Sequence, residues 1–240
     1  MKIALLGYGK MGKAIEQIAV SKGHTIVLKT DSDTYTVQEL AAADVAIEFS
    51  TPDSALTNIK KCGDAGVPVV VGTTAWYHQF EEAKSYTESK QGGLFTATNF
   101  SIGVNLFWKI TEQASKLLSD YSEYEPSIDE IHHTQKLDAP SGTAITTAEK
   151  MLNQLGRKNE WVHHENGIGS ISNELELSVR SFREVNVPGT HTVKFENDID
   201  SIEITHTAHS RQGFAAGALK AAEFMVNKTG IYTMNDLLNL

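Results

Sequence analysis

The chain contains a single cysteine, Cys62, among its 240 residues. One cysteine cannot form a disulfide within the chain, and sequences poor in cysteine are typical of reducing compartments. The apolar run 3–6 ends at Gly7, so it is too short for a signal sequence or a membrane span. We therefore expect a cytoplasmic protein without a targeting segment and without a membrane partner.

Basic residues are also scarce. The sequence has 21 Lys and Arg residues against 30 Asp and Glu residues, which gives a formal net charge of −9. Nucleic-acid backbones bind to basic surfaces, so we expect no nucleic-acid partner. An anionic substrate would need a locally positive pocket, which His132, His133 and Lys136 could form.

The first hundred residues alternate short apolar runs with amphipathic stretches, the pattern of βαβ units around a parallel sheet. Strands are predicted at 2–6, 25–28, 45–49, 67–71 and 94–97, and helices at 10–21, 53–65 and 76–89.

After residue 101 the pattern changes. Helices are predicted at 104–118 and 143–155, strands at 127–132, 174–181, 192–196 and 201–207 with a hairpin connection at 197–200, and a last helix from the apolar stripe Phe214, Ala218, Ala221, Ala222 and Met225. We expect an α/β protein with two domains. Residues 1–102 and 208–240 form a Rossmann-like parallel-sheet domain, and residues 103–207 form an inserted α+β domain with a mainly antiparallel sheet.

A glycine motif lies between the first predicted strand and the first predicted helix. Gly7-Tyr8-Gly9-Lys10-Met11-Gly12 has the spacing G-x-G-x-x-G. In this context Gly7 permits a tight turn, Gly9 lets the backbone approach a pyrophosphate, and Gly12 allows close packing of helix and strand. The motif predicts a bound dinucleotide.

An acidic residue is expected about 20 positions after such a motif, where it binds the adenosine ribose. Asp31 stands at that distance from Gly12. An acid here favours NADH, but a plain turn residue is nearly as plausible, and Lys10, Lys13 or Lys29 could accept the 2′-phosphate of NADPH. The sequence leaves the choice between NADH and NADPH open.

Two more loops follow predicted strands of the same sheet, at 49–52 and at Gly72-Thr73-Thr74. Loops at the carboxyl ends of parallel strands line the ligand crevice. Thr73 and Thr74 could reach the nicotinamide ribose or carboxamide, or could form an ordinary turn.

The segment 130–144 has the densest chemistry in the chain. His132 and His133 are adjacent, so in a strand they point to opposite faces and at most one is easily a catalytic acid. Lys136 adds a fixed positive charge, and Gly142 and Thr143 open a helix whose N–H groups can bind a carboxylate.

Three other interpretations remain for these residues. The histidines could bind a metal with His163, His164, His206 or His209, although the spacing matches no metal motif. They could be structural histidines, and Lys136 could be a solvated surface charge. Because all these groups occur in one short stretch, a purely structural role for every one of them is less plausible than a catalytic site.

The segment Glu130-Ile-His-His…Lys136…Asp138-Ala-Pro-Ser-Gly-Thr-Ala144 resembles the signature of the dihydrodipicolinate reductase family. These are the 4-hydroxy-tetrahydrodipicolinate reductases of bacterial lysine and diaminopimelate biosynthesis. The resemblance covers nearly the whole chain, because 7–12 and 72–74 resemble the family's cofactor loops, 97–103 its hinge, and 204–211 its return into the last helix.

The resemblance implies hydride transfer from NADH or NADPH that reduces 4-hydroxy-tetrahydrodipicolinate to tetrahydrodipicolinate, without a metal. His132 would donate the proton, Lys136 would assist catalysis and bind a carboxylate, and the second domain would also join a homotetramer through its sheet. The other implied substrate-binding residues are His133, Gly142 and Thr143. The implied cofactor-binding residues are Gly7, Tyr8, Gly9, Lys10, Met11, Gly12, Asp31, Gly72, Thr73, Thr74, Ala97, Thr98, Asn99 and Phe100.

The chain departs from the family pattern at two places. Segment 180–191 lacks the usual glycine-rich start, and no arginine follows Asp31 directly. Two other functions stay open on sequence alone: an aspartate or homoserine dehydrogenase of the same plan, and a nucleotide-sensing module without chemistry.

Overall fold

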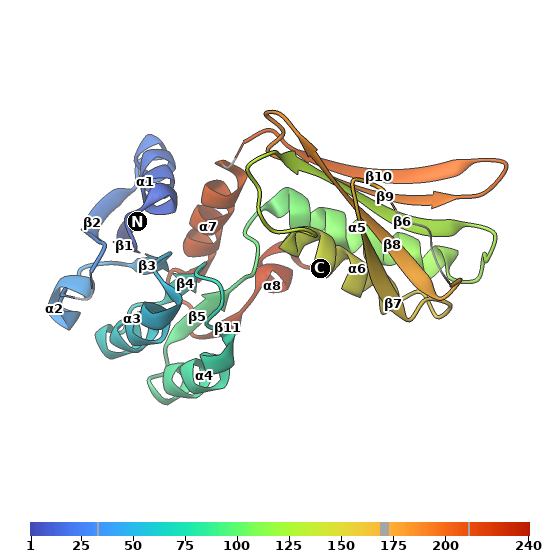
Figure 1. The fold of residues 1–240 in the computed structure, drawn as a ribbon. Helices are drawn as coiled ribbons and strands as arrows, with labels where there is room; N and C mark the ends of the chain where they lie inside the picture. Colours follow the sequence, from blue (N-terminus) through green and yellow to red (C-terminus); the bar gives the residue numbers. More distant parts are fainter. Residues whose placement is uncertain (33, 169–172, 211) are drawn as a thin grey trace. The chain divides into compact units, whose positions relative to one another are not determined.

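The computed structural model describes residues 1–32, 34–168, 173–210 and 212–240, and the chain divides into two compact units (Figure 1). The first unit consists of Met1–Ile102 and Gln212–Leu240, and the second of Gly103–Arg211. No helix in these described ranges combines the length and the hydropathy needed to cross a membrane.

The first unit is built on a six-stranded sheet whose order is β11-β5-β4-β3-β1-β2. All of its pairings are parallel, as the sequence predicted. Its elements are β1 (Lys2–Leu6), α1 (Lys10–Ser21), β2 (Thr25–Thr30), α2 (Val37–Leu40), β3 (Val45–Glu48), α3 (Pro52–Ala65), β4 (Val69–Val71), η1 (Tyr77–Gln79), α4 (Phe80–Ser89), β5 (Gly93–Thr96), α7 (Gln212–Met225), β11 (Gly230–Tyr232) and α8 (Met234–Leu238).

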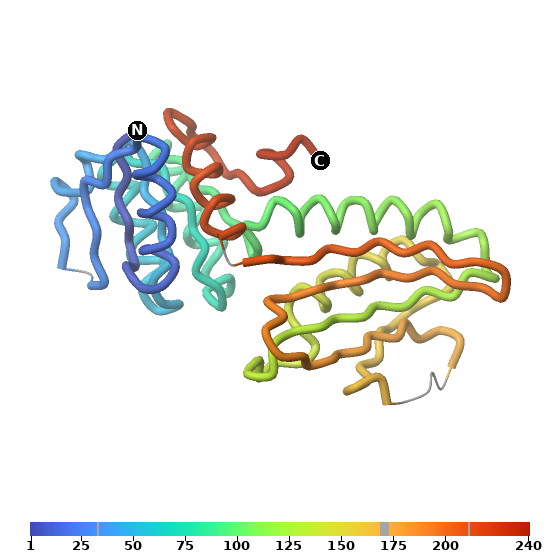
Figure 2. Tube along the Cα trace, turned by 90° about the horizontal axis from the view of Figure 1, so that it is seen from above, coloured from blue at the N-terminus to red at the C-terminus, as the bar shows by residue number. Residues whose placement is uncertain are grey.

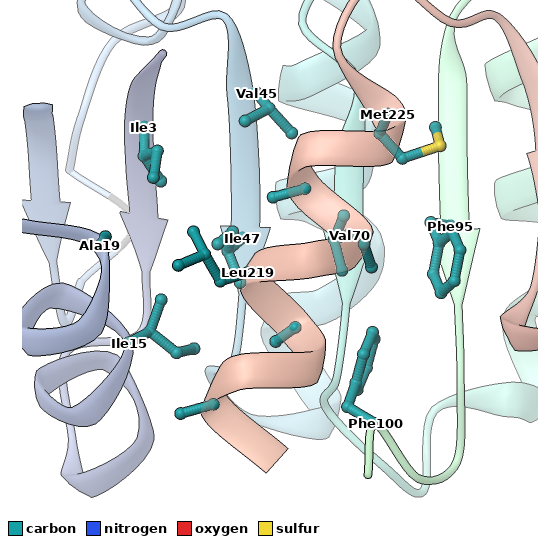
Figure 3. Packing of buried hydrophobic residues seen from close by; sticks show 14 of the residues in the cluster. Ile3, Ile15, Ala19, Val45, Ile47, Val70, Phe95, Phe100, Leu219 and Met225 are labelled. Atoms are coloured by element: carbon teal, nitrogen blue, oxygen red, sulfur yellow. The ribbon is translucent and has the colours of Figure 1, made fainter. Parts of the chain in front are cut away.

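Two hydrophobic clusters cover the two faces of this sheet, which is why its central strands are apolar at almost every position. One cluster joins α1 and α7 to the sheet, and Figure 3 shows Leu219 of α7 beside Ile47 of β3. The other contains Val69 and Val71 of β4 together with Ile59 of α3. Burying one such side chain fully contributes about 1.5–3 kcal/mol.

Helix α7 closely approaches the segment that follows β5 at Gly217. A Cβ on Gly217 would lie 1.7 Å from the carbonyl oxygen of Phe100, so only glycine fits there. The predicted apolar stripe is buried at Ala218, Ala221, Ala222 and Met225.

Cys62 lies on α3 in the second of these clusters and has no exposed surface. Burial raises the pKa of its thiol. The thiolate is the reactive form of cysteine, so Cys62 is chemically inert in the folded chain.

The second unit has a five-stranded sheet of order β10-β9-β6-β8-β7 (Figure 2). Its elements are α5 (Ile102–Leu118), β6 (Glu125–His133), α6 (Gly142–Leu152), β7 (Glu160–Glu165), β8 (Glu176–Glu184), β9 (Gly189–Glu196) and β10 (Ser201–Ala208). The predicted hairpin connection at 197–200 is confirmed, because Asn197 N–H donates to the Asp200 carbonyl oxygen at 3.0 Å.

This second sheet is mixed, so the expectation of a mainly antiparallel sheet was wrong in that detail. β9 pairs antiparallel with β6 and β10, whereas β8 pairs parallel with β6 and β7. The parallel pairings arise because helix α6 connects β6 to β7. Such a crossover connection brings the chain back to the sheet in the same direction.

Helices α5 and α6 cover one face of the second sheet. Phe107 and Trp108 of α5 and Met151 of α6 pack there against Ile128 and Phe195. Among the described residues, the opposite face carries mainly polar side chains, including Ser127, Ser178 and Arg180, which line a groove of about 990 Å³.

Candidate active site and cofactor site

The glycine motif of the first unit adopts the predicted turn. Gly7 has φ +98°, and a Cβ there would lie 2.1 Å from the Phe49 carbonyl oxygen. A Cβ on Gly12 would lie 2.3 Å from the Gly7 carbonyl oxygen, whereas a Cβ on Gly9 would have nothing within 4 Å. Gly7 and Gly12 are therefore fixed by packing, and Gly9 leaves open space beside the loop.

Helix α1 begins directly after this loop. Its N-cap is Gly9, which supplies no side-chain cap. The first N–H groups of α1 and the positive end of its dipole can therefore serve an anion. The residues fit a dinucleotide pyrophosphate.

Two cavities flank the glycine loop and share three of its lining residues, Gly9, Phe49 and Ser50. The first, of about 430 Å³, is also lined by Leu6, Gly7, Thr30, Asp31, Ser32, Thr51, Ser54 and Asn58. The second, of about 450 Å³, is also lined by Lys10, Met11, Pro52, Gly72, Thr73 and Thr74. The structure thus places the predicted Asp31 on one side of the loop and Thr73 and Thr74 on the other.

Asp31 is held against the glycine loop, because its carboxylate accepts a hydrogen bond from the backbone N–H of Tyr8. The nearby cation Lys29 is already engaged: its Nζ lies 3.1 Å from Glu16 Oε1 and 4.8 Å from the centre of the Tyr8 ring. The Tyr8 hydroxyl donates to Glu16. These pairings leave the Asp31 carboxylate as the charge that borders the cavity.

The predicted hinge residues follow β5. Thr98 is exposed and Ala97 and Asn99 are half-buried, with Asn99 Oδ1 accepting from Ser101 N–H at 2.9 Å. The Phe100 side chain is buried in the core of the first unit. Phe100 could therefore contact a cofactor only through its backbone.

Glu48, at the end of β3, is a buried residue that the sequence did not predict as part of a site. Its Oε1 accepts from Ser50 N–H at 3.0 Å and from Asn58 at 3.3 Å, and Asn58 in turn accepts from the Tyr35 hydroxyl at 2.7 Å. Burial raises the pKa of Glu48, although hydrogen bonds such as that from Ser50 act in the opposite direction. The available signal was an acid at the end of an apolar strand, directly before the cavity-lining residues Phe49 and Ser50.

Replacing Glu48 by glutamine is expected to change how stability depends on pH. Because the pKa in the fold is raised, the wild-type carboxyl contributes stability below its ordinary value of 4.5 that is lost as pH rises through the raised pKa. The slope reaches at most about 1.4 kcal/mol per pH unit for one proton. The melting temperature of Glu48→Gln should therefore rise relative to that of wild type as pH increases. The melting temperature of the exposed control Glu81→Gln should equal that of wild type at every pH. Parallel curves for wild type and Glu48→Gln would contradict the assignment.

In the second unit, three strands and one helix converge on Glu130. This carboxylate is completely buried. Its two oxygens accept from Ser141 N–H at 3.0 Å each, and Oε1 accepts from Ser181 Oγ at 2.7 Å. His132 Nδ1 lies 3.5 Å and His191 Nε2 lies 3.7 Å from Oε2.

The charges of this cluster follow from their surroundings. Burial raises the pKa of Glu130, but the hydrogen bonds from Ser141 and Ser181 outweigh burial and bring it below its ordinary value. Burial lowers the pKa of His132, and Glu130 acts against that effect. Burial lowers the pKa of His191 to about 3, so this side chain is neutral at physiological pH.

Lys136 stands in the loop after β6 with its side chain 20% exposed. Its Nζ binds both oxygens of Asp138, at 2.7 and 2.8 Å. Arg183 of β8 holds the same loop by donating to the Asp138 carbonyl oxygen at 2.8 Å. Lys136 therefore lies in the loop that joins β6 to α6. Its partner Asp138 is an exposed acid, which the carboxylate of a ligand could replace.

Helix α6 starts at the predicted place. Ser141 is its N-cap and accepts from Ala144 N–H at 3.2 Å. Gly142 is exposed, and a Cβ on it would have nothing within 4 Å. Gly142 and half-buried Thr143 thus lie at an accessible helix start.

His133 follows His132 in β6 and therefore points to the opposite face. Its register partner is Glu184, while that of His132 is Arg183. The structure brings His132 together with Glu130 and His191, but it does not place His133 in that cluster.

Glu130, His132 and His191 each offer one atom that could bind a metal, all within 4.8 Å of one another. However, Glu130 already accepts three hydrogen bonds, and the guanidinium of Arg183 lies 3.7 Å from its Oε1. A second cation beside that guanidinium would be repelled. The surroundings fit a hydrogen-bonded cluster better than a metal site.

The atypical segment 180–191 contains three residues of the site, Ser181, Arg183 and His191. The segment begins with the end of β8 (Arg180–Glu184) and finishes with the start of β9 (Gly189–His191). Between these strands Asn186 has φ +63°, a left-handed backbone conformation that glycine adopts most easily. The sequence reading missed Glu130, Ser181, Arg183 and His191 as site residues. For Glu130 a signal existed, because it precedes His132 by two positions and so shares its face of the strand.

Together, a glycine loop between two cavities and a buried acid–histidine cluster define an oxidoreductase of the dinucleotide-binding α/β class. Residues 1–100 match the family model of the dihydrodipicolinate reductase N-terminus, and residues 103–238 match that of its C-terminus. The chain belongs to the dihydrodipicolinate reductase family.

Relatives of similar length support this membership. The chain is 45% identical to the 4-hydroxy-tetrahydrodipicolinate reductase of Christiangramia forsetii, covering 100% of this chain and 98% of the relative. It is 37% identical to the enzyme of the same name from Methanosarcina acetivorans, over 99% and 89%.

Its fold is similar to that of a dipicolinate-bound dihydrodipicolinate reductase from Paenisporosarcina, with a TM-score of 0.79, 21% identity and 97% of each chain covered. Residue Arg211 of the predicted return segment lies outside the described residues.

Proposed function

We propose that this chain reduces 4-hydroxy-tetrahydrodipicolinate to tetrahydrodipicolinate with a hydride from NADH or NADPH, in lysine and diaminopimelate biosynthesis. The observation that carries the proposal is the buried Glu130–His132 pair beside Lys136 and an open helix start, in a chain that also holds the glycine loop. Replacing a hydroxyl group by hydrogen consumes one hydride and one proton and releases water, so the enzyme needs a hydride source and an acid.

The hydride comes from the reduced nicotinamide. On the first unit, the backbone from Gly7 to Gly12 would hold the pyrophosphate, and Asp31 the adenosine ribose. The opposite cavity, at Gly72, Thr73 and Thr74, would hold the nicotinamide side, with 97–100 completing it.

His132 supplies the proton in this proposal. Its lowered pKa makes the protonated imidazole a stronger acid than free histidine, and its Nε2 is the nitrogen that does not face Glu130. Lys136 binds one carboxylate of the substrate, and the start of α6 at Gly142 and Thr143 binds the other. His133 points to the opposite face of β6 and has no role in this arrangement. The dipicolinate-bound structure of the reductase from Paenisporosarcina supports a small dicarboxylate as substrate.

The decisive experiment follows the nicotinamide absorbance of NADH and of NADPH while the substrate is generated in situ. We expect oxidation of the cofactor that depends on the substrate. Aspartate and homoserine are assayed in parallel with the oxidised cofactors. Turnover of either, without turnover of the dicarboxylate, would replace the proposed function.

Asp31→Asn tests the cofactor side. The amide keeps an acceptor for Tyr8 N–H but removes the charge that repels a 2′-phosphate and accepts from a ribose hydroxyl. We expect the ratio of kcat/KM for NADPH to that for NADH to rise about tenfold, the equivalent of about 1.4 kcal/mol. Asp120→Asn, an exposed change in the second unit, should leave the ratio unaltered. An unaltered ratio in Asp31→Asn would make Asp31 a turn residue only.

We further propose a cytoplasmic homotetramer joined through the sheet of the second unit. The polar sheet face opposite α5 and α6, with its groove of about 990 Å³, supports this assembly. Light scattering coupled to gel filtration should give four times the chain mass of 26.3 kDa. A monomer mass would exclude the tetramer.

A further inference from the structure

We propose that Glu130 is the positioning residue for the acid His132, holding the imidazole through Nδ1 so that Nε2 carries the proton to the substrate. The proposal rests on the proposed function, because it assigns a partner to the acid of that reaction.

The carboxylate of Glu130 is fixed by hydrogen bonds from two residues. Ser141 N–H at the start of α6 and Ser181 Oγ on β8 donate to it, at 3.0 and 2.7 Å. Glu130 and His132 lie two positions apart on β6, and the register partner of Glu130 on β9 is His191. A fully buried acid with this many donors stays ionised and cannot move away from the imidazole.

The two ring nitrogens of His132 have different surroundings. Nδ1 is buried and lies 3.5 Å from Glu130 Oε2, an ion-pair distance, and it makes no hydrogen bond to any of the described residues. Nε2 lies beside the backbone of Gly189, where an added Cβ would be 3.0 Å away. Glycine at this position leaves Nε2 as the nitrogen with space beside it.

Charged groups from several elements act on His132. Lys136 and Arg183 lower its pKa and Asp138 raises it, but burial is the largest influence and lowers it. His191 is neutral, and Glu130 is the largest of the influences that raise the pKa. Removing the Glu130 charge should therefore lower the pKa of His132 further. The fraction of protonated, proton-donating imidazole at neutral pH would then fall.

The first test is Glu130→Gln, which keeps a carbonyl oxygen for Ser141 N–H and removes the charge. We expect the high-pH limb of the kcat profile to move down by about 1–3 pH units, with kcat at pH 7.5 lowered about tenfold or more. KM for the substrate and cofactor binding should stay near wild type. Glu160→Gln, an exposed carboxylate on the same sheet, is the matched control and should retain the wild-type profile.

The second test asks whether Glu130 acts through His132. If it does, the double variant Glu130→Gln/His132→Gln has the same residual kcat as His132→Gln alone. Losses that multiply, or a wild-type pH profile in Glu130→Gln, overturn the proposal. Should Glu130→Gln fail to fold, Glu130→Asp draws the carboxylate back and should show a smaller shift in the same direction; an unchanged profile again overturns it.

A third measurement separates this inference from the proposed function. Histidine NMR signals, assigned by the loss of one signal in His132→Gln, give the pKa of His132 without any turnover. A lower pKa in Glu130→Gln supports the pairing even if no substrate is reduced, and an equal pKa overturns it.

Discussion

Substituting His132 by glutamine is expected to lower kcat by about 10²–10⁴, the usual contribution of a positioned acid. Glutamine has a similar reach but cannot release a proton at neutral pH. The glycine loop that would hold the cofactor belongs to the other unit, so the Kd for NADH or NADPH, measured by nicotinamide fluorescence, should stay within about twofold. His132 is 7% exposed, so the substitution needs a folding check by circular dichroism.

The matched control is His78→Gln, which removes an exposed histidine of the first unit. Its kcat should equal that of wild type. Wild-type turnover in His132→Gln would remove His132 from catalysis and leave the buried cluster with a structural role.

Lys136→Ala should both lower kcat and raise KM for the substrate. A hydrogen-bonded ion pair with a substrate carboxylate contributes about 1.5–3 kcal/mol, so we expect kcat/KM to fall by at least about tenfold to a hundredfold. The lysine pairs with exposed Asp138 at 2.7 Å, and this pairing contributes little to stability, so the melting temperature should hardly change.

Lys116→Ala, an exposed lysine of α5, is the control for lost surface charge. If Lys136→Ala and Lys116→Ala have the same KM, Lys136 is only a solvated cation.

The sequence predicted the first unit well, because its signals are local. Strands buried on both faces are continuous apolar runs such as 67–71, and the glycine spacing marks the turn between β1 and α1. Several short elements were missed: α2 has four residues, β11 has three and α8 has five, too few for a periodic pattern.

The second unit was harder to predict for a physical reason. β7 reads Glu-Trp-Val-His-His-Glu, and three of its six residues are only half-buried, so it shows no alternation. Without β7, the next predicted strand after α6 was 174–181, so the crossover β6-α6-β7 and the parallel pairing of β7 with β8 could not be inferred.

The same contrast applies to the site. His132, Lys136 and Gly142 lie within one short segment, so the motif alone identified them. Ser181 and His191 reach Glu130 through the registers β6–β8 and β6–β9, with sequence separations that no local pattern records. The sequence around His132 could therefore indicate Glu130, but it could not indicate the partners of Glu130 on the other strands.

The inert thiol of Cys62 gives this protein a practical advantage for spectroscopy. A cysteine introduced on an exposed position of either unit would be the one that maleimide reagents modify, since the buried native thiol does not form its reactive anion. A pair of fluorophores, one on each unit, can thus be attached without first removing the native residue. Energy transfer between them would then report whether cofactor or dicarboxylate changes the distance between the units in solution.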